Sequence, residues 1–342
     1  MFLRFAVAFF VIFAAAPAFA VDDAVAKCDQ LAASPFDKTK PANVKGVDFG
    51  DIDSVPAIQA CDAALALDPE NPRLMFQAAR AHDTTPAGVE KAFILFKKAA
   101  GMGHILANYS TGVALHDGAG VHRSTKQAMK YYRVAADAGF SWAMNEVGKL
   151  YQFGDGTEQN FTEAVKWYQL SVNLGDGEAM NRLAGRYEYG EGVAIDLVKA
   201  GELNKKSAEA GYAFGMNDYA VALQNGKGVA KDMDAAIKYF KRAADMNNDY
   251  AQFNLGTLMF EGKGVAKDEA GGFELFAKSF EANDDLAKLF IDDRGGNPAD
   301  PEEMKTIETM LKWKGLIEGE PDGELDDESV NALVSIRDKA DQ

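Results

Sequence analysis

The chain has 342 residues and is acidic: 52 Asp and Glu outnumber 36 Lys and Arg, which gives a formal net charge of −16 at pH 7. Nucleic acid and anionic lipid surfaces repel a chain of this charge, and no basic stripe offsets it, so we expect neither as a partner. Two cysteines and four scattered histidines supply no Cys/His metal-ligand set, so we expect no metal site.

Residues 1–20 have the pattern of a secretory signal peptide. Arg4 supplies a positive charge, an apolar run follows over residues 5–16, and Ala-Phe-Ala at 18–20 is a small-x-small cleavage site. The run is short for a membrane span, which needs about 20 apolar residues; an uncleaved membrane anchor is the alternative. No second apolar segment follows. We therefore expect an exported protein, located in a bacterial periplasm, with no membrane span after cleavage.

Residues 21–71 form an N-terminal segment that contains both cysteines, Cys28 and Cys61. In an oxidising compartment an even pair of thiols usually forms a disulfide. Residues 22–33 and 54–67 each read as a short helix, so the bond would join the N-terminal helix to the next one and stabilise the fold by about 2–4 kcal/mol. Two buried free thiols are the alternative.

A 36-residue period governs the middle of the chain. Gly-x-Gly triplets begin at residues 118, 154, 190, 226 and 262, and a second phase of single Gly or Asn residues keeps the same period at 103, 139, 175, 211, 247 and 283. Such self-similarity is typical of stacked supersecondary units. Gly and Asn tolerate a left-handed backbone and so end helices. Each repeat therefore reads as helix, Gly-x-Gly turn, helix, Gly turn.

Apolar residues within each repeat fall on one helical face. In the first helix they recur at i, i+4 and i+8, as in Ala143, Val147 and Tyr151. The second helix sets small residues beside large ones, as in Ala236 and Phe240, which suits close helix stacking. The pattern predicts helical hairpins that pack on one another.

These repeats resemble the Sel1-like repeat family, a relative of the tetratricopeptide repeat with a longer period and a glycine-rich turn. The strings AQFNLG at 251–256 and KYFKRAA at 238–244 carry the likeness, which spans residues 72–290. It implies an all-α fold, a right-handed α/α solenoid of helical hairpins. The third repeat is the poorest match, because Gly201 and Asn204 stand where its neighbours have apolar or aromatic residues. We expect its second helix to be the least protected and to act as a hinge.

Residues 291–342 break this rhythm and hold 15 acidic and 6 basic residues. Gly315, Gly319 and the Asp-Gly pair at 322–323 resemble the small three-helix peptidoglycan-binding module, which implies tethering to the cell wall. Leu316 or Ile317 stands where that module has an aromatic residue, and the acidic charge would repel the carboxylates of peptidoglycan at low salt. We therefore expect a helical cap on the solenoid, with peptidoglycan binding as the alternative.

No catalytic constellation is apparent. The chain has neither a Gly-x-Ser-x-Gly elbow nor a His-Glu-x-x-His motif, and its Gly-x-Gly triplets lack the strand and the Lys-Ser/Thr of a phosphate loop. We expect no enzyme activity, no catalytic residues and no cofactor.

The remaining candidate for function is the concave face of the solenoid, which the first helix of each pair lines. Its Asn and charged side chains could hold a peptide or folded domain through backbone amides and ion pairs, and a solvated helix face is the alternative. The predicted partner-binding residues are Asn145, Glu146, Lys149, Asn181, Arg182, Arg186, Asn217, Asp218 and Asn254.

We therefore predict a non-enzymatic periplasmic scaffold that binds a protein or peptide. The family resemblance further implies a role in regulating an envelope process, because exported bacterial members include partners of envelope sensors. A cell-wall-associated protein tethered by its C-terminal module is the alternative.

Overall fold

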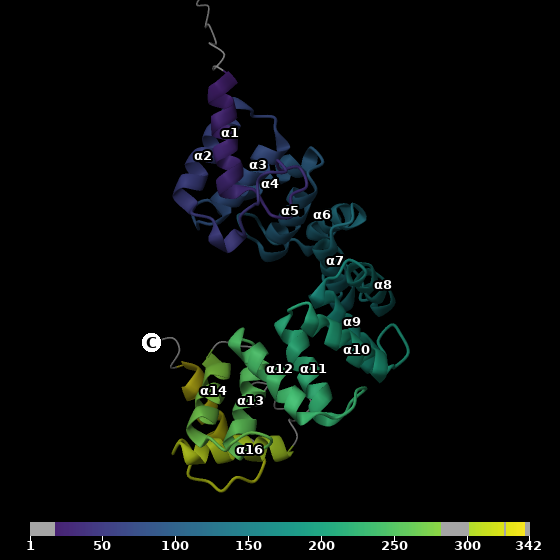
Figure 1. Ribbon diagram of the computed structural model, residues 1–342, viewed down its shortest axis with the longest axis vertical. Helices are drawn as coiled ribbons and strands as arrows, with labels where there is room; N and C mark the ends of the chain where they lie inside the picture. Colours follow the sequence, from purple (N-terminus) through teal and green to yellow (C-terminus); the bar gives the residue numbers. More distant parts are fainter. Residues whose placement is uncertain (1–17, 282–300, 325, 339–342) are drawn as a thin grey trace, which may run out of the picture. The chain divides into compact units, whose positions relative to one another are not determined.

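The computed structural model describes residues 18–281, 301–324 and 326–338, and within these ranges it contains helices and no strands. The chain forms two compact units, residues 1–159 (unit 1) and 160–342 (unit 2), which are described separately (Figure 1). The predicted all-α fold of helical hairpins is confirmed. The predicted signal peptide falls mainly outside the described residues, since only its last three residues belong to them.

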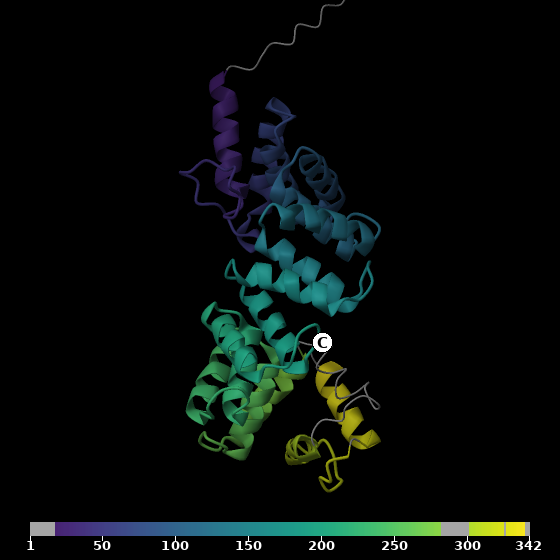
Figure 2. The same cartoon turned by 90° about the vertical axis from the view of Figure 1, so that its right-hand side faces the viewer.

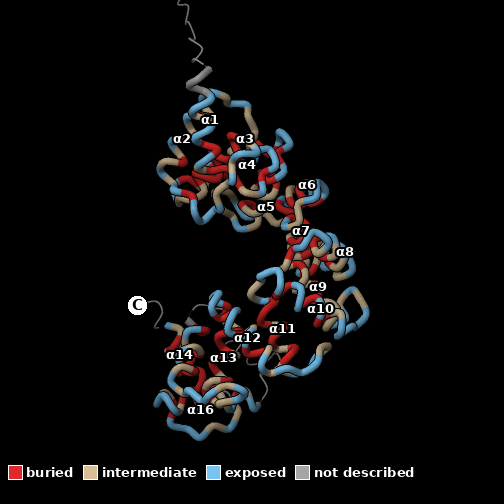
Figure 3. Tube along the Cα trace, viewed as in Figure 1, coloured by how far each residue is buried: buried red, intermediate tan, exposed pale blue. Residues whose placement is uncertain are grey.

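Unit 1 contains α1 (Ala18–Ala32), a short 3-10 helix η1 (Phe49–Asp51), α2 (Ser54–Leu67), α3 (Pro72–Asp83), α4 (Val89–Gly101), α5 (Ile105–Asp117), α6 (Thr125–Asp137) and α7 (Ser141–Phe153). Unit 2 contains α8 (Phe161–Val172), α9 (Gly177–Tyr189), α10 (Leu197–Glu209), α11 (Ala213–Asn225), α12 (Met233–Asp245), α13 (Asp249–Glu261), α14 (Glu269–Glu281), α16 (Pro301–Trp313) and α17 (Asp327–Arg337). Helices α5, α7, α9, α11 and α13 are the first helices of their repeats. Buried residues lie on the sides of the helices that face one another (Figure 3).

A disulfide holds the N-terminal helices together. Cys28 on α1 is bonded to Cys61 on α2, and both side chains are fully buried, so the predicted pairing is confirmed. Around them lies one apolar core that continues through Leu74 and Ala78 of α3. This core extends across residue 71, where the sequence predicts the start of the repeats, and that boundary stays a prediction.

The Gly-x-Gly triplets end the first helices as predicted. The first glycine of each triplet has a left-handed backbone and caps its helix; Gly226, for example, has φ 73° and donates its N–H to the carbonyl of Ala222. The second glycine has another task. At Gly228 a Cβ would clash with the carbonyl oxygen of Leu197, at the start of the preceding second helix α10.

The same contact recurs along the chain. Gly120, Gly156 and Gly192 likewise meet the backbone at the start of the second helix 31 residues earlier. Only glycine permits an approach this close between two backbone segments. The triplets are therefore both helix ends and packing contacts between successive hairpins of one unit.

Gly201, the reason for expecting a hinge in the third repeat, has a packing role. A Cβ on this residue would lie 2.7 Å from Cγ1 of Val229 and 3.2 Å from the carbonyl oxygen of Gly228. The glycine inside α10 thus makes room for the turn that follows α11. Whether α10 is the least protected helix stays a prediction.

The described helices of the C-terminal segment cover the end of the last repeat. Met304, Ile307 and Leu311 of α16 and Leu333 of α17 share one buried core with the phenylalanines of α13 and α14, and Figure 2 shows these helices in yellow beside the green end of unit 2. Glu308, also buried, accepts hydrogen bonds from the backbone N–H groups of the Asp-Gly pair at 322–323, at 2.9 and 2.7 Å. Residues 291–300 of the predicted module lie outside the described residues.

We predict that Gly228→Ala destabilises the protein by about 2–5 kcal/mol. A left-handed backbone costs an alanine roughly 1–2 kcal/mol, and the clash with Leu197 adds an overpacking cost of about 1–3 kcal/mol. Gly226→Ala is the matched control, because it has the same left-handed backbone but its Cβ would have its nearest contact 3.4 Å away. Urea unfolding of both variants measures the difference. Equal destabilisation by the two substitutions would show that the close approach contributes nothing.

Candidate functional site

Three of the predicted partner-binding residues lie on α7 in unit 1. Asn145 is 2% exposed, and its Oδ1 atom has no hydrogen-bond partner in the described part of the chain. Glu146 and Lys149 are half-buried and form an ion pair with 2.9 Å between Nζ and Oε1. Because the Asn145 side chain is inside the repeat, it does not belong to the surface that a partner would meet. The binding roles of Glu146 and Lys149 stay predictions.

In unit 2 four of the predicted residues form one chain of hydrogen bonds. Asn181 donates to Asp218 at 2.6 Å and to Asn204 at 3.1 Å. Asn217 donates to the other oxygen of Asp218 at 3.1 Å, and Asn254 donates to Asn217 at 3.0 Å. This amide chain, Asn204–Asn181–Asp218–Asn217–Asn254, links α9, α10, α11 and α13. Its first role is therefore to join successive helices.

Burial shapes the chemistry of the amide chain. It raises the pKa of Asp218, and the hydrogen bonds from Asn181 and Asn217 act against that rise by favouring the carboxylate. Asn217 is itself 5% exposed, so its side chain is not available to a partner. Partner binding by Asn181, Asp218 and Asn254 stays a prediction.

The two predicted arginines are held by carboxylates. Arg182 Nε lies 2.8 Å from Glu178, and Arg186 Nη1 lies 2.8 Å from Glu191 while its guanidinium sits over the ring of Phe161. Arg182 and Glu178 are both partly exposed. They form a charged pair that water, and hence a partner, can reach.

An exposed aromatic position was not recognised from the sequence. It is the second residue of first helices other than α5, where Leu106 is buried: Trp142 on α7 is 42% exposed and Phe214 on α11 is 41% exposed. Tyr250 holds the same position on α13, and its ring centroid lies 6.2 Å from that of Phe214. Glu178 fills the position on α9. A search of the 36-residue register would have found aromatic residues at three of these positions. We call Trp142, Glu178, Phe214 and Tyr250 together the position-two row.

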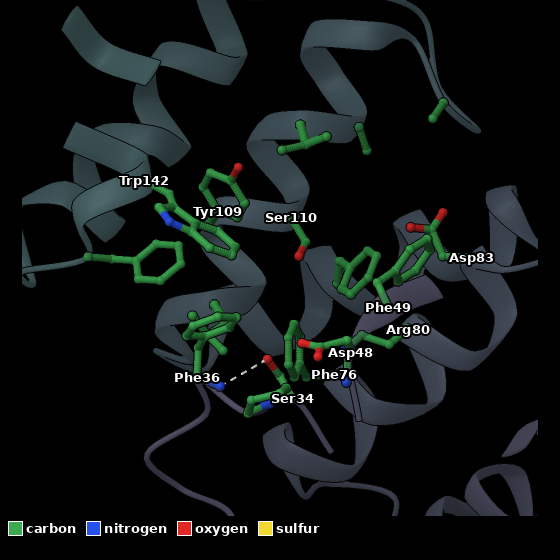
Figure 4. A pocket seen from close by; sticks show the side chains of 17 residues that line it. Ser34, Phe36, Asp48, Phe49, Phe76, Arg80, Asp83, Tyr109, Ser110 and Trp142 are labelled. Atoms are coloured by element: carbon green, nitrogen blue, oxygen red, sulfur yellow. Dashed lines mark hydrogen bonds between the residues drawn. The ribbon is translucent and has the colours of Figure 1, made fainter. Parts of the chain in front are cut away.

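Unit 1 also contains a pocket of about 360 Å³ (Figure 4). Its floor is apolar and comes from α3, α4 and α5, with Phe76, Phe96 and Leu106 among its residues. Tyr109 and Trp142 stand on one side of it in Figure 4, whereas Phe49 stands on the other. The remaining side is formed by residues 33–48, the wall segment, which runs between α1 and η1.

Buried polar contacts fix the wall segment. Arg80 of α3 donates to the carbonyl oxygens of Ala32 and Val47. Asp37 lies 3.2 Å from Nε2 of His104, and both side chains are almost completely buried. Phe36 packs edge-on against Trp142, with 4.7 Å between ring centroids. These contacts hold the wall segment in place as one side of the pocket.

The pKa values of two side chains in this region, Arg80 and Asp37, differ from their usual values. Burial lowers the pKa of Arg80 to about 10, although nearby Asp48 and Asp37 favour its charged form. For Asp37, burial would raise the pKa, but hydrogen bonds from His104 and Thr39 outweigh it and hold the pKa below its usual value of 3.8. A lowered carboxyl pKa means that the folded state favours the ionised form of Asp37.

The rim of the pocket carries two carboxylates. Asp83 at the end of α3 is half-buried beside Phe49 (Figure 4), and burial raises its pKa. Within the described residues its side chain makes no hydrogen bond or ion pair. Asp48 is exposed and lies near Arg80. The pocket thus combines an apolar floor, aromatic walls and an acidic rim.

The repeats match a family model. The model of the Sel1 repeat matches residues 82–104, 105–140, 143–176, 177–212, 213–248 and 249–284. The chain belongs to the Sel1 repeat family. Proteins built from Sel1 repeats are generally non-enzymatic scaffolds, typically for protein interaction. No curated protein matches the chain.

Solved structures of Sel1 repeat proteins are similar. A Sel1 repeat protein from Oxalobacter formigenes is 26% identical, with a TM-score of 0.60, over 65% of this chain and 95% of that one. The structure of c5321, a protective antigen present in uropathogenic Escherichia coli strains that displays an SLR fold, is 21% identical, with a TM-score of 0.54, over 94% of this chain and 71% of that one. The second likeness concerns the fold alone.

The described residues contain no group of three or more His, Cys, Asp and Glu side chains placed to hold a metal ion. In the same residues, every helix is too short or too polar to cross a membrane.

We predict that Asp37→Asn lowers the free energy of unfolding by about 1–3 kcal/mol at pH 7, because it removes a buried charged hydrogen-bond acceptor. The pKa of Asp37 is lower in the folded protein, so its stabilisation is complete above pH 3.8 and is lost as the pH falls below that value. Urea unfolding at pH 7, 5 and 3 should therefore show the difference from the native protein shrinking at pH 3. Asp23→Asn, at an exposed position on α1, is the control. A difference that persists unchanged at pH 3 would contradict this assignment.

Proposed function

We propose that this Sel1 repeat protein is a non-enzymatic scaffold of the bacterial periplasm that binds a protein or peptide partner through the exposed first turns of its first helices. The observation that carries the proposal is the position-two row, in which Trp142 and Phe214 are each about two-fifths exposed. Aromatic residues are enriched in the energetic centres of protein interfaces. A partly exposed Trp or Phe at a repeated position is a surface that a partner can bury.

Charged groups beside these rings support a protein partner. Glu178, in the same row, pairs with Arg182, and both are partly exposed. In unit 2 the ring of Tyr212 lies 5.6 Å from that of Phe214, and burial followed by the charge of Glu178 raises the pKa of Tyr212 to about 12. Apolar rings rimmed by charges and hydroxyl groups are the usual composition of a protein interface.

Two features support export. The pattern of residues 1–20 is that of a signal peptide, and the buried Cys28–Cys61 disulfide is a bond that persists in oxidising compartments. Regulation of an envelope process would follow from a partner in that compartment. Tethering to the cell wall is the less favoured function, because α16 and α17 bury their apolar faces against the last repeat.

We predict that Trp142→Ala and Phe214→Ala each weaken partner binding about tenfold or more, because the loss of an interface hot spot costs at least about 1–2 kcal/mol. The full-length protein is cross-linked in cells to identify its partner, and affinities for the purified partner are then measured by calorimetry. The matched controls are Val134→Ala and Leu170→Ala, which remove comparably exposed apolar side chains from second helices in the two units.

Melting temperatures accompany these measurements, so that a loss of affinity can be distinguished from a loss of stability. The proposal fails if the control variants lose as much affinity as the two aromatic variants. It also fails if neither aromatic variant loses affinity.

A further inference from the structure

The size, the apolar lining and the charged rim of the pocket in unit 1 indicate which kind of ligand it can bind. Its volume of about 360 Å³ lies at the small end of ligand sites, which range from about 300 to 1,000 Å³. A space of this size suits one large side chain with its adjoining backbone. Phe76, Phe96 and Leu106 on the floor are buried, so the site favours an apolar group.

The wall segment already places one aromatic side chain, Phe36, against the side of the pocket. Phe36 belongs to a turn between α1 and η1, and its ring packs edge-on against Trp142 while remaining 50% exposed. The ring of Tyr109 lies 6.2 Å from that of Trp142. One side of the pocket is thus an aromatic surface on which an aromatic side chain of the wall segment already packs.

The rim adds a charge preference. Asp83 is half-buried and, among the described residues, makes no hydrogen bond or ion pair, and Asp48 stands exposed on the rim. Arg80, the cation of the pocket, is buried, and its two terminal nitrogens donate hydrogen bonds to the carbonyl oxygens of Ala32 and Val47. The groups at the mouth that can reach a ligand are therefore acidic. A half-buried carboxylate without a partner gains most from a cationic group.

Building on the proposed function, we infer that this pocket binds a peptide segment in which a large apolar side chain is flanked by Lys or Arg. The apolar side chain enters between Trp142 and Phe49 and rests on the floor. The flanking cation pairs with Asp83 or Asp48. An acidic or phosphorylated segment is excluded by the same rim through like-charge repulsion.

The test uses the full-length oxidised protein and four fluorescein-labelled octapeptides of Gly and Ser that differ only in a central triplet. The triplets are Lys-Leu-Lys, Lys-Phe-Lys, Lys-Ser-Lys and Glu-Leu-Glu, and binding is followed by fluorescence polarisation. The first two peptides should bind at least about tenfold more tightly than the last two. The Lys-Ser-Lys peptide controls for general attraction to an acidic protein. The inference is overturned if Lys-Ser-Lys binds as tightly as Lys-Leu-Lys and Lys-Phe-Lys. It is also overturned if Lys-Leu-Lys does not bind.

Two substitutions locate the binding. Asp83→Asn keeps the size of the side chain, and we expect it to reduce the preference for Lys-Leu-Lys over Glu-Leu-Glu several-fold. Asp137→Asn, an exposed carboxylate on α6, should leave that preference unchanged. If both variants behave alike, the pocket is not the site. The peptide comparison on the native protein stands whether or not a variant folds.

Phe214→Ala separates this inference from the proposed function. Because Phe214 belongs to unit 2, its loss should leave peptide binding in unit 1 unchanged. If the peptides fail to bind while Phe214→Ala still weakens the natural partner, the pocket assignment falls and the scaffold function remains. If the peptides bind but neither Phe214→Ala nor Trp142→Ala affects the natural partner, the proposed use of the position-two row falls.

Discussion

The close contact between a turn glycine and the backbone of the preceding second helix is the constraint on which the repeats depend. Gly228 meets Leu197 in this way, and Gly192 meets Phe161 at the same spacing of 31 residues. Because the contact is between backbones, it fixes the spacing of hairpins within a unit regardless of which side chains surround it. First helices of one unit are then set side by side, and on α7 and α11 the residue in the second position is partly exposed.

In this arrangement, residues in the middle of a first helix differ in exposure from residues in its first turn. Side chains in the middle of a first helix have neighbours on both sides, so Asn145 and Asn217 are buried and Asp218 holds two asparagines. Side chains in the first turn extend past those neighbours, which leaves Trp142 and Phe214 partly exposed. The middle of the first helix is therefore used for packing between repeats, and its first turn is the surface that we propose for binding.

Much of the fold was predictable because it is periodic. Glycine phases indicated the helix ends, and the pair of cysteines in a sequence with a signal-peptide pattern indicated the disulfide. Burial of Asn145 and Asn217 was not predictable, because a helical wheel shows one apolar face and not the second contact made by a neighbouring repeat. The pocket was missed for another reason: the wall segment has no period, and it is held by Arg80 and His104, residues that are distant in sequence from Val47 and Asp37.

Site-specific photo-cross-linking in living cells tests most directly whether first-helix turns are the binding surface. A benzophenone amino acid is placed singly at position 142, 178 or 214 of the position-two row, and at 134 or 170 on second helices. The account predicts that the same partner is cross-linked from at least two positions of the row and from neither second-helix position. Cross-links that form mainly from 134 and 170 would contradict it, since the partner would then bind the opposite set of helices.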